Sequence, residues 1–347
     1  MAQKISQMTE QTTASMTETG TSDFLGGYTT TGGNANRKFS LSGLANYFLN
    51  KFKMTLGGSS QTVKSAIDAL NSNKLGQIPR CKDITSYFTD GTLWNRISGT
   101  GYPYAYYDIQ PGDYIDMGRT ITCPNIQQDT YGTVGSRYVT VVSLGGLQGN
   151  GDSSAVTYNH LVMVPGQGLG GSQHFGRHRM NPTNTTEGGY VGSQMFTDIL
   201  GAVVSAGSVA TGATINQQLY YVFGSHLKTT RELLSNAVGT SLYNRFGSAT
   251  GASSGWAWTS AQACLMSEVE VYGSVVWSSS AYDTGSACKQ FELFAQSKAA
   301  INNRSAYYWL KDVASSSSFA LVARNGGADY ISASNAGYFV RPRFIIA

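Results

Sequence analysis

The sequence predicts an α+β fold made of short strands, two helices and long glycine-rich loops. Its 347 residues include 41 Gly and 21 Tyr, and only 13% are charged, whereas disordered chains are rich in charge and poor in aromatic residues. Short apolar runs separated by Gly, Asn, Ser and Asp clusters continue from about Cys81 to the end of the sequence. Two stretches within this region instead carry apolar residues at helical spacing.

Residues 1–80 differ from the rest and are predicted to form an extended and helical N-terminal arm. Residues 1–35 are rich in Thr, Ser, Gly and Gln and contain few apolar anchors. Residues 40–56 are amphipathic and predict a helix capped by Ser40, and a second short helix is expected over 63–70. Helices this short are not stable alone, so we expect the arm to self-associate, with a homotrimer as the working hypothesis.

Residues 81–347 are expected to form one domain. Helices are predicted from about Ser193 to Val204 and from about Asn216 toward Leu234. Six short apolar runs bounded by turn residues predict strands: Tyr114–Met117, Tyr138–Leu144, His160–Val164, Val269–Tyr272, Phe319–Val322 and Phe339–Ile346.

Charge and cysteine content exclude several classes of protein. The net charge of +4 is small and no block of Lys or Arg occurs, so no nucleic-acid partner is expected. No apolar run approaches the roughly 20 residues of a membrane span, and residues 1–20 have no hydrophobic signal core, so folding in the bacterial cytoplasm is expected. Four widely spaced cysteines, Cys81, Cys123, Cys264 and Cys288, predict buried free thiols in place of a zinc site or disulfide framework.

An ordered series of motifs carries a family resemblance over about residues 85–347. The motifs are GDYI (112–115), HFGRHRMN (174–181), GGYVGSQM (188–195), ACLMSEVEVYG (263–273), YYWLKD (307–312) and YFVRPRFIIA (338–347). In this order they resemble a domain family of gut phages, prophages and Firmicutes surface proteins that is similar to the C-type lectin fold. Relatives of this family include the variable proteins of diversity-generating retroelements, of which the major tropism determinant is an example. Separately, KFSLSGLANYFLNKF (38–52) resembles the start of many phage tail-fibre and baseplate proteins.

The resemblance implies that the C-terminal segment forms a ligand-binding face. Tyr, Ser and Asn between apolar anchors also match the composition of antibody paratopes, where Tyr gives rigid contact area and Ser and Asn give adaptable hydrogen bonds. The alternative is an ordinary surface hairpin with Asn325-Gly326 as its turn. The same positions are candidates for diversification by a retroelement. The expected ligand-binding residues are Tyr307, Tyr308, Ser315, Ser317, Arg324, Asn325, Asp329, Tyr330, Ser332, Asn335 and Tyr338.

Two histidines raise the question of a metal site. His174 and His178 are four residues apart, a spacing that binds metal on a helix, but Gly176 lies between them and no Glu follows His174. We expect no metal here, and instead hydrogen bonds that support the fold among His174, Arg177, Arg179 and Asn181. No Glu-Pro-Asn-type calcium motif is present either.

Two other patterns suggest chemistry without predicting it. Glu268 and Glu270 share one face of a predicted strand, and paired carboxylates can hydrolyse glycosides, but a buried role with Arg341 or Arg343 as partner is the stronger expectation. Residues 166–171 match G-x-G-x-x-G, yet no convincing helix follows, so a loop is expected. No catalytic residue and no cofactor is therefore predicted.

Taken with the resemblance, these features predict a bacteriophage virion surface protein that recognises a host-cell surface glycan or protein. It is expected at a tail-fibre tip or head fibre, with residues 1–56 contacting other virion structural proteins. Two other classes stay open. A structural capsid-decoration protein would bury the 315–338 surface against neighbouring subunits. A depolymerase would need Glu268, Glu270 or Asp283 in an open groove, and an oxidase of the formylglycine-generating type would need a suitably placed cysteine pair.

Overall fold

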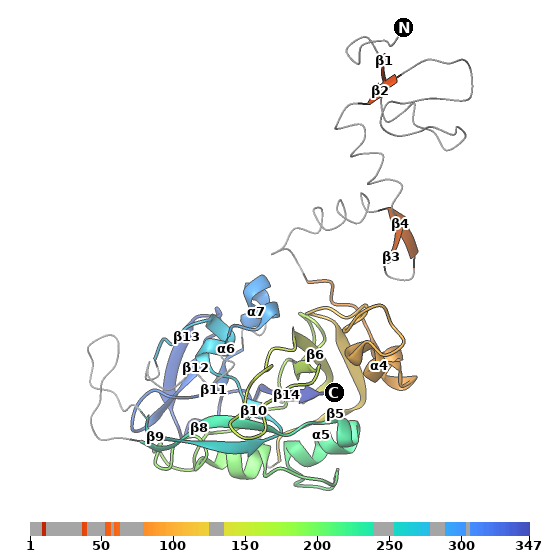
Figure 1. Ribbon diagram of the computed structural model, residues 1–347. Helices are drawn as coiled ribbons and strands as arrows, with labels where there is room; N and C mark the ends of the chain where they lie inside the picture. The colour runs from red at the N-terminus through yellow and green to blue at the C-terminus, as the bar shows by residue number, and fades with distance from the viewer. Residues whose placement is uncertain are drawn as a thin grey trace. The chain divides into compact units, whose positions relative to one another are not determined.

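The computed structural model describes residues 9–11, 37–39, 53–56, 59–62, 79–124, 135–238, 253–277, 289–302 and 306–347. The chain divides into two compact units, Met1–Leu75 and Gly76–Ala347, each of which is described by itself. Figure 1 draws the elements of both units.

The described part of the first unit consists of two strand pairs. Strand β1 (Thr9–Gln11) pairs in parallel with β2 (Arg37–Phe39), and β3 (Lys53–Leu56) pairs antiparallel with β4 (Ser59–Thr62). The helix predicted over 40–56 is therefore wrong for its last four residues, which pair as a strand across a Gly-Gly sequence typical of a two-residue hairpin. Residues 40–52 and the helix predicted over 63–70 lie outside the described residues.

The second unit is α+β, as predicted, and is organised around a five-stranded antiparallel sheet in the order β10-β14-β7-β6-β5. The strands are β5 (Tyr114–Ile121), β6 (Ser136–Leu144), β7 (Leu161–Pro165), β10 (Cys264–Leu265) and β14 (Pro342–Ile346). The strands predicted at 114–117, 138–144 and 160–164 are confirmed, and the one at 339–346 is confirmed over its last five residues.

Two further β units complete this part of the molecule. A three-stranded antiparallel sheet has the order β11-β12-β13, with β11 (Tyr308–Val313), β12 (Ser318–Val322) and β13 (Ala328–Ser332). It contains the predicted strand 319–322. A hairpin pairs β8 (Thr230–Val238) with β9 (Ser253–Ala261).

Short helices connect and cover these sheets: α3 (Thr85–Thr89), α4 (Thr92–Ser98), η3 (Met195–Leu200), α5 (Ile215–Phe223), η4 (Gly224–His226), α6 (Glu268–Tyr272), α7 (Glu292–Gln296) and α8 (Lys298–Ile301). The helix predicted over 193–204 is present over Met195–Leu200, as the π-helical segment η3. The helix predicted from Asn216 toward Leu234 is α5 followed by the 3-10 turn η4, which ends at His226. Leu234 belongs to strand β8 instead.

The strand predicted over Val269–Tyr272 is wrong, because these residues form α6. The Ser267 side chain accepts a hydrogen bond from the backbone N–H of Glu270, and the Glu270 side chain accepts one from the backbone N–H of Ser267. This reciprocal capping box satisfies the free N–H groups at the start of the helix and outweighs the alternating pattern of the sequence.

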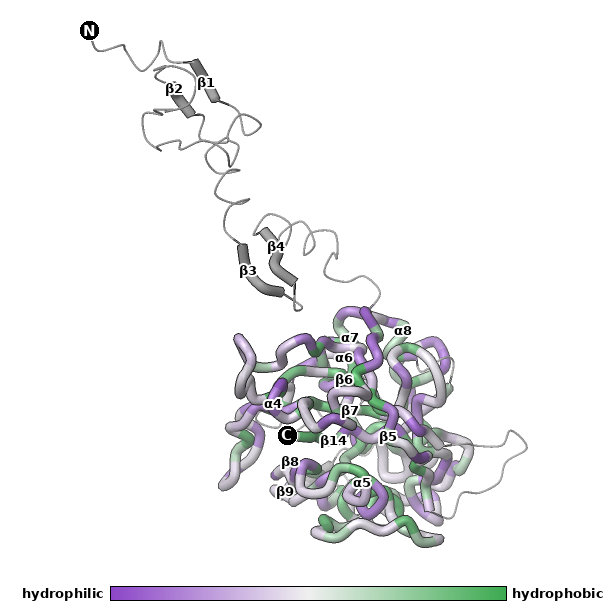
Figure 2. Tube along the Cα trace, turned by 90° about the vertical axis from the view of Figure 1, so that its right-hand side faces the viewer, coloured by the Kyte–Doolittle hydropathy of each residue, from purple (hydrophilic) through white to green (hydrophobic). Residues whose placement is uncertain are grey.

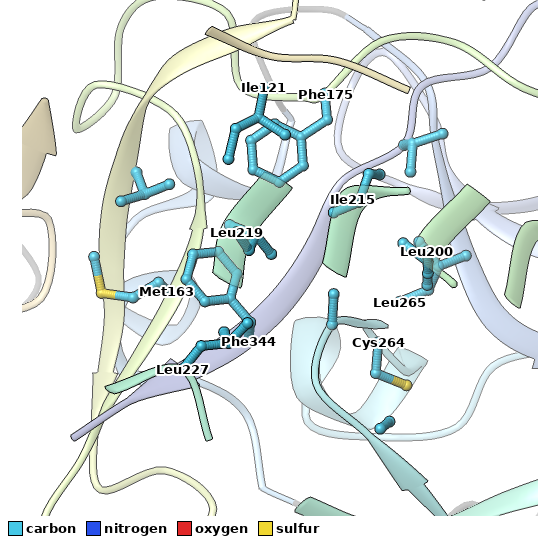
Figure 3. Packing of buried hydrophobic residues seen from close by; sticks show 14 of the residues in the cluster. Ile121, Met163, Phe175, Leu200, Ile215, Leu219, Leu227, Cys264, Leu265 and Phe344 are labelled. Atoms are coloured by element: carbon cyan, nitrogen blue, oxygen red, sulfur yellow. The ribbon is translucent and has the colours of Figure 1, made fainter. Parts of the chain in front are cut away.

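The main core lies between the five-stranded sheet and α5. Met163 of β7 and Phe344 of β14 point toward Leu219 of α5, and all three are buried (Figure 3). The ring of Phe223, at the end of α5, lies 5.7 Å from that of Phe344. The hydropathy colouring in Figure 2 shows β14 as an apolar stretch inside this unit. Its neighbour β7 is buried along its whole length, as expected for strands covered on both faces.

Within the described residues, no helix combines the length and apolar character that a membrane span requires.

Candidate ligand-binding surface

The residues expected to bind a ligand lie on and around the β11–β13 sheet. Both faces of the sheet are anchored in the core, through Trp309 and Phe319 on one side and Leu310 and Ala320 on the other. Asn325 and Gly326 form the turn between β12 and β13, with Gly326 at a φ of +80°, so the predicted turn is confirmed. The expected binding residues nevertheless divide into separate groups.

One group combines aromatic and charged side chains beside the hairpin turn, and we call Tyr307, Arg324, Asp329 and Tyr338 the Tyr307–Tyr338 cluster. The rings of Tyr307 and Tyr338 meet edge to face at 5.3 Å, and the Arg324 guanidinium lies over the Tyr307 ring at 5.2 Å. Tyr338 also packs edge to face on buried Trp309 at 5.2 Å, which ties the cluster to the core.

The electrostatics of the cluster follow from this arrangement. Burial raises the pKa of the Tyr338 phenol, and nearby Tyr307 and Asp329 act in the same direction. Tyr338 is therefore a neutral hydroxyl at physiological pH and can both donate and accept a hydrogen bond. Exposed Arg324 and Asp329 add one charge of each sign.

Tyr330 lies on the opposite face of the sheet. Side chains alternate along β13, so Tyr330 and Ser332 point away from the face that carries Asp329. The Tyr330 ring packs against Trp277 at 4.8 Å and is 38% exposed. A ligand bound at the Tyr307–Tyr338 cluster would therefore not contact Tyr330.

A third group occupies the other end of the sheet and is rich in serine. The Ser315 and Ser317 hydroxyls lie 3.4 Å apart, and the Ser317 carbonyl accepts a hydrogen bond from the backbone of Ala333. The backbone N–H of Asn335 donates to the carbonyl of Ser332. The five residues of β12 separate this end from the hairpin turn, a distance of roughly 15 Å. The expected binding residues therefore do not form one small site together.

The prediction that Tyr308 binds a ligand is wrong, because its side chain is fully buried and cannot contact a ligand in solution. Its ring packs beneath the Arg341 guanidinium at 5.0 Å, and burial raises the pKa of Tyr308 to about 12. Tyr307 and Tyr308 are neighbours in an extended segment, so their side chains point to opposite faces and only one of them reaches the outer surface.

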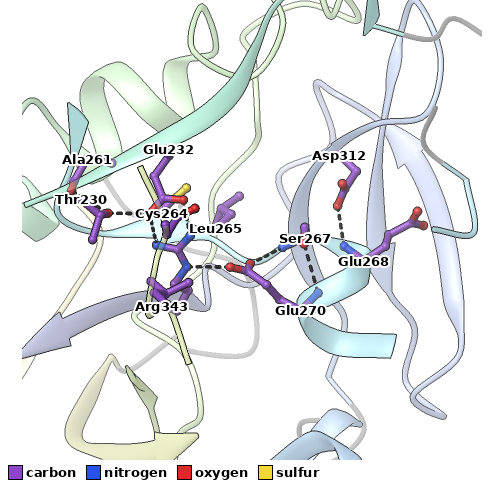
Figure 4. A network of polar contacts seen from close by, with 12 residues as sticks. Thr230, Glu232, Ala261, Cys264, Leu265, Ser267, Glu268, Glu270, Asp312 and Arg343 are labelled. Carbon is purple, nitrogen blue, oxygen red and sulfur yellow. Dashed lines mark hydrogen bonds and ion pairs between the residues drawn. The ribbon is translucent and has the colours of Figure 1, made fainter. Parts of the chain in front are cut away.

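Of the carboxylates considered for catalysis, Glu270 belongs to a buried network around Arg343 (Figure 4). The Arg343 guanidinium donates two hydrogen bonds to Glu232, at 2.8 and 2.7 Å, and one to Glu270 at 3.0 Å. Of the two arginines expected as partners of Glu270, Arg343 forms the pair, and Arg341 instead bonds Ala300 and Gln173. Burial opposes ionisation of Glu232, yet the adjacent charge of Arg343 lowers the pKa of Glu232 to about 2.

Glu268 is also buried and serves the backbone. Its carboxylate accepts hydrogen bonds from the backbone N–H groups of Val276 and Trp277 at 2.8 and 2.9 Å. The sequence predicts that Glu268 and Glu270 share one face of a strand. This prediction is wrong, because both residues lie in the first turn of α6. Neither carboxylate reaches the surface. Asp283, the other acid considered, lies outside the described residues.

The paired histidines support the fold. The His174 ring stacks on Phe339 at 3.8 Å, and its Nδ1 accepts a hydrogen bond from the backbone of Gly176. The Nδ1 of His178 bonds the carbonyl of Arg179 at 2.8 Å. Burial lowers the pKa of His174 to about 3, so the ring is neutral. Among the residues that the structure describes, no group of three or more His, Cys, Asp or Glu side chains has the geometry of a metal site.

Three of the four cysteines lie in the described residues and all three are free thiols. Cys123 and Cys264 are buried and Cys81 is half-buried. Burial raises the pKa of each of these thiols, so little reactive thiolate forms at neutral pH. Residues 166–171 form the predicted loop, closed by two hydrogen bonds between the backbones of Gln167 and Gly170.

Comparison of the chain with protein-family models, curated proteins and solved structures finds no match to any of them.

Proposed function

We propose that this chain is a bacteriophage virion surface protein that binds a host-cell surface ligand through the Tyr307–Tyr338 cluster. In this proposal the second unit has a C-type-lectin-like fold, which the motif order of residues 85–347 supports. The first unit attaches the protein to other virion proteins and assembles it, as a homotrimer. Several identical copies on one virion would then strengthen binding by avidity.

The observation that carries the proposal is the contrast between a rigid base and a polar rim. Trp309 and Phe319 are fully buried beneath the cluster, while Arg324 and Asp329 are exposed. Rigid aromatic side chains on a fixed sheet lose little conformational entropy on binding, and flanking charged groups provide orientation. Sequence changes at the exposed positions would leave the core intact, which also suits a surface diversified by a retroelement.

The test compares binding of purified full-length protein to intact bacterial cells with binding of a Tyr307→Ala/Tyr338→Ala variant. We expect the double variant to lose at least about tenfold in affinity, because two packed aromatic contacts are removed. Tyr221→Ala is the matched control, since Tyr221 is 57% exposed and lies on α5. Thermal melting must show that all variants are folded.

Each outcome separates the classes of function. Cell binding that is lost only in the double variant supports receptor recognition at this cluster. Cell binding that the double variant keeps refutes the chosen surface. If the parent protein binds no strain that supports the phage, receptor binding is refuted and a structural decoration protein becomes the better hypothesis.

A further inference from the structure

A second group of tyrosines lies far from the Tyr307–Tyr338 cluster, in the loop that joins α4 to β5. The loop has the sequence YPYAYYD over residues 102–108, and Tyr104 within it is 48% exposed. In Figure 1 helix α4 and the β11–β13 sheet lie at opposite sides of the second unit. The two surfaces therefore cannot form one site for a small ligand.

The loop is held in one conformation by two side chains at unusual backbone positions. Tyr106 and Asp108 have φ values of +59° and +54°, a region that residues with side chains rarely adopt. The Tyr106 hydroxyl accepts a hydrogen bond from the backbone of His160 at 3.3 Å. The Asp108 carboxylate binds the Lys82 ammonium and the Tyr87 hydroxyl, each at 2.6 Å. These anchors fix the loop before any ligand binds.

The fixed loop holds the guanidinium of Arg96 among three aromatic rings. Its central carbon lies 3.8 Å from the ring centre of Tyr87, 4.6 Å from that of Tyr102 and 5.6 Å from that of Tyr107. The Tyr102 and Tyr107 rings are themselves stacked at 5.0 Å. Within the described residues, the only hydrogen bond from the Arg96 guanidinium is the one that Nε donates to Thr92 Oγ1 at 3.3 Å. The two terminal nitrogens thus donate no hydrogen bond to another described residue, which leaves their hydrogen bonds to water or to a further partner.

The charges around the loop favour an anion as that partner. Asp108 and Asp113 are already paired with Lys82 and Arg80. No ion pair joins Arg96 to a carboxylate of the described residues. Asp90 acts on Arg96 only through the electrostatic field, and its carboxylate accepts a hydrogen bond from the backbone N–H of Thr92. A guanidinium whose plane is fixed matches a carboxylate through two parallel hydrogen bonds.

We infer that Tyr87, Arg96, Tyr102, Tyr104 and Tyr107, here called the Arg96 platform, form a second binding site, which takes a carboxylate-bearing saccharide. The guanidinium would bind the carboxylate, while the tyrosine rings cover the C–H face of the sugar ring. Tyrosine suits this role because one side chain offers both a flat apolar face and a hydroxyl. This site goes beyond the proposed function, since it shares no residue with the Tyr307–Tyr338 cluster.

The test measures binding of full-length protein to an array of uronic-acid and sialic-acid oligosaccharides. Each acidic oligosaccharide is printed beside its methyl ester, which keeps the ring and removes the charge. We expect binding to at least one acidic form and about tenfold weaker binding to its ester, because hydrogen bonds to a charged group are lost. Arg96→Lys keeps the charge but loses the planar fork and is expected to weaken binding about tenfold. Tyr102→Ala should weaken it about threefold or more.

Two controls separate this site from general effects of charge, folding and the other surface. Arg137→Lys changes an exposed arginine elsewhere, and Tyr221→Ala removes a ring that lies 4.9 Å from the Arg119 guanidinium. Both should leave binding unchanged. Absence of binding to every acidic oligosaccharide overturns the inference, as does binding that Arg96→Lys leaves intact. Saccharide binding that is lost in Tyr338→Ala but kept in Arg96→Lys would also overturn it, while supporting the proposed function. Binding of acidic peptides but no saccharide would show that the ligand class is wrong.

Discussion

Replacing Arg343 with methionine removes the cation that two buried carboxylates share. Arg343 comes from β14, Glu232 from β8 and Glu270 from α6, so one guanidinium links three elements. Methionine has a similar length and fills most of the space, so the change isolates the lost charge and hydrogen bonds. Glu232 and Glu270 stay buried in the variant, with Lys311 as the remaining cation near them.

The expected loss of stability is about 3–5 kcal/mol, the usual effect of removing one partner of a buried ion pair. A second argument gives a similar size. Folding lowers the pKa of Glu232 from 4.5 to about 2, which corresponds to roughly 3 kcal/mol of favourable interaction at neutral pH. Loss of the bond to Glu270 adds to this amount.

Urea unfolding of the full-length protein at pH 7, followed by tryptophan fluorescence and circular dichroism, measures the change. The matched control is Arg137→Met, because Arg137 bonds Asp116 at 2.6 Å but its side chain is 52% exposed. That variant should lose less than about 1 kcal/mol. Equal losses of unfolding free energy in the two variants would show that burial does not increase the contribution of the Arg343 network to stability.

The pH dependence gives a second check with a defined sign. The folded pKa of Glu232 is depressed, so its contribution in the parent is present above pH 4.5 and is lost as the pH falls toward 2. Without Arg343, burial dominates and Glu232 favours the protonated form. Acidification from pH 7 to 4 should therefore narrow the gap in unfolding free energy between parent and variant. A gap that stays constant over this range would refute the reasoning.

Three further predictions concern the scaffold. Gly189→Ala should cost about 2–4 kcal/mol in urea unfolding, because φ is +65° and the new Cβ would lie 2.5 Å from the carbonyl oxygen of Ser235; an effect below 1 kcal/mol would contradict this close packing. Ser267→Ala removes the cap of α6 and should cost about 1–2 kcal/mol in urea unfolding; a loss below about 0.5 kcal/mol would mean that the hydroxyl contributes little. Burial lowers the pKa of His174 to about 3, so protonation of His174 favours the unfolded chain as the pH falls below 6.5. His174→Gln should therefore reduce the loss of unfolding free energy between pH 6.5 and 5, and an unchanged loss would exclude His174 as its source.

Much of the fold could be predicted from short apolar runs between turn residues. The runs at 138–144, 160–164 and 319–322 are strands because they are the right length and are buried on both faces. Helix α6 was missed because SEVEV alternates like a strand. The Ser267 and Glu270 spacing is, however, a capping-box signature, so this helix could have been found in the sequence.

The binding residues were harder to predict because they depend on register and on strand ends. Nothing in the dipeptide Tyr307-Tyr308 says which ring is buried; the pairing of Tyr308 with Val322 decides it. Likewise, Ser317 and Arg324 are only seven residues apart, yet β12 carries them to opposite ends of the sheet. The Arg96 platform was not predicted at all, because it depends on contacts of Arg96 with three separate tyrosines.

The place of β14 in the five-stranded sheet has a consequence for how the protein is made. Strand β14 lies between β7 and β10, so its residues 344–346 pair with residues about 180 positions earlier in the chain, and residues 342 and 343 pair with residues about 80 positions earlier. During synthesis the edges of β7 and β10 stay unpaired until those residues leave the ribosome. Pairing across so long a separation is slow, and open strand edges can pair with other chains in the meantime. Nascent chains at this stage are therefore expected to be the form most prone to aggregation and the form that chaperones bind.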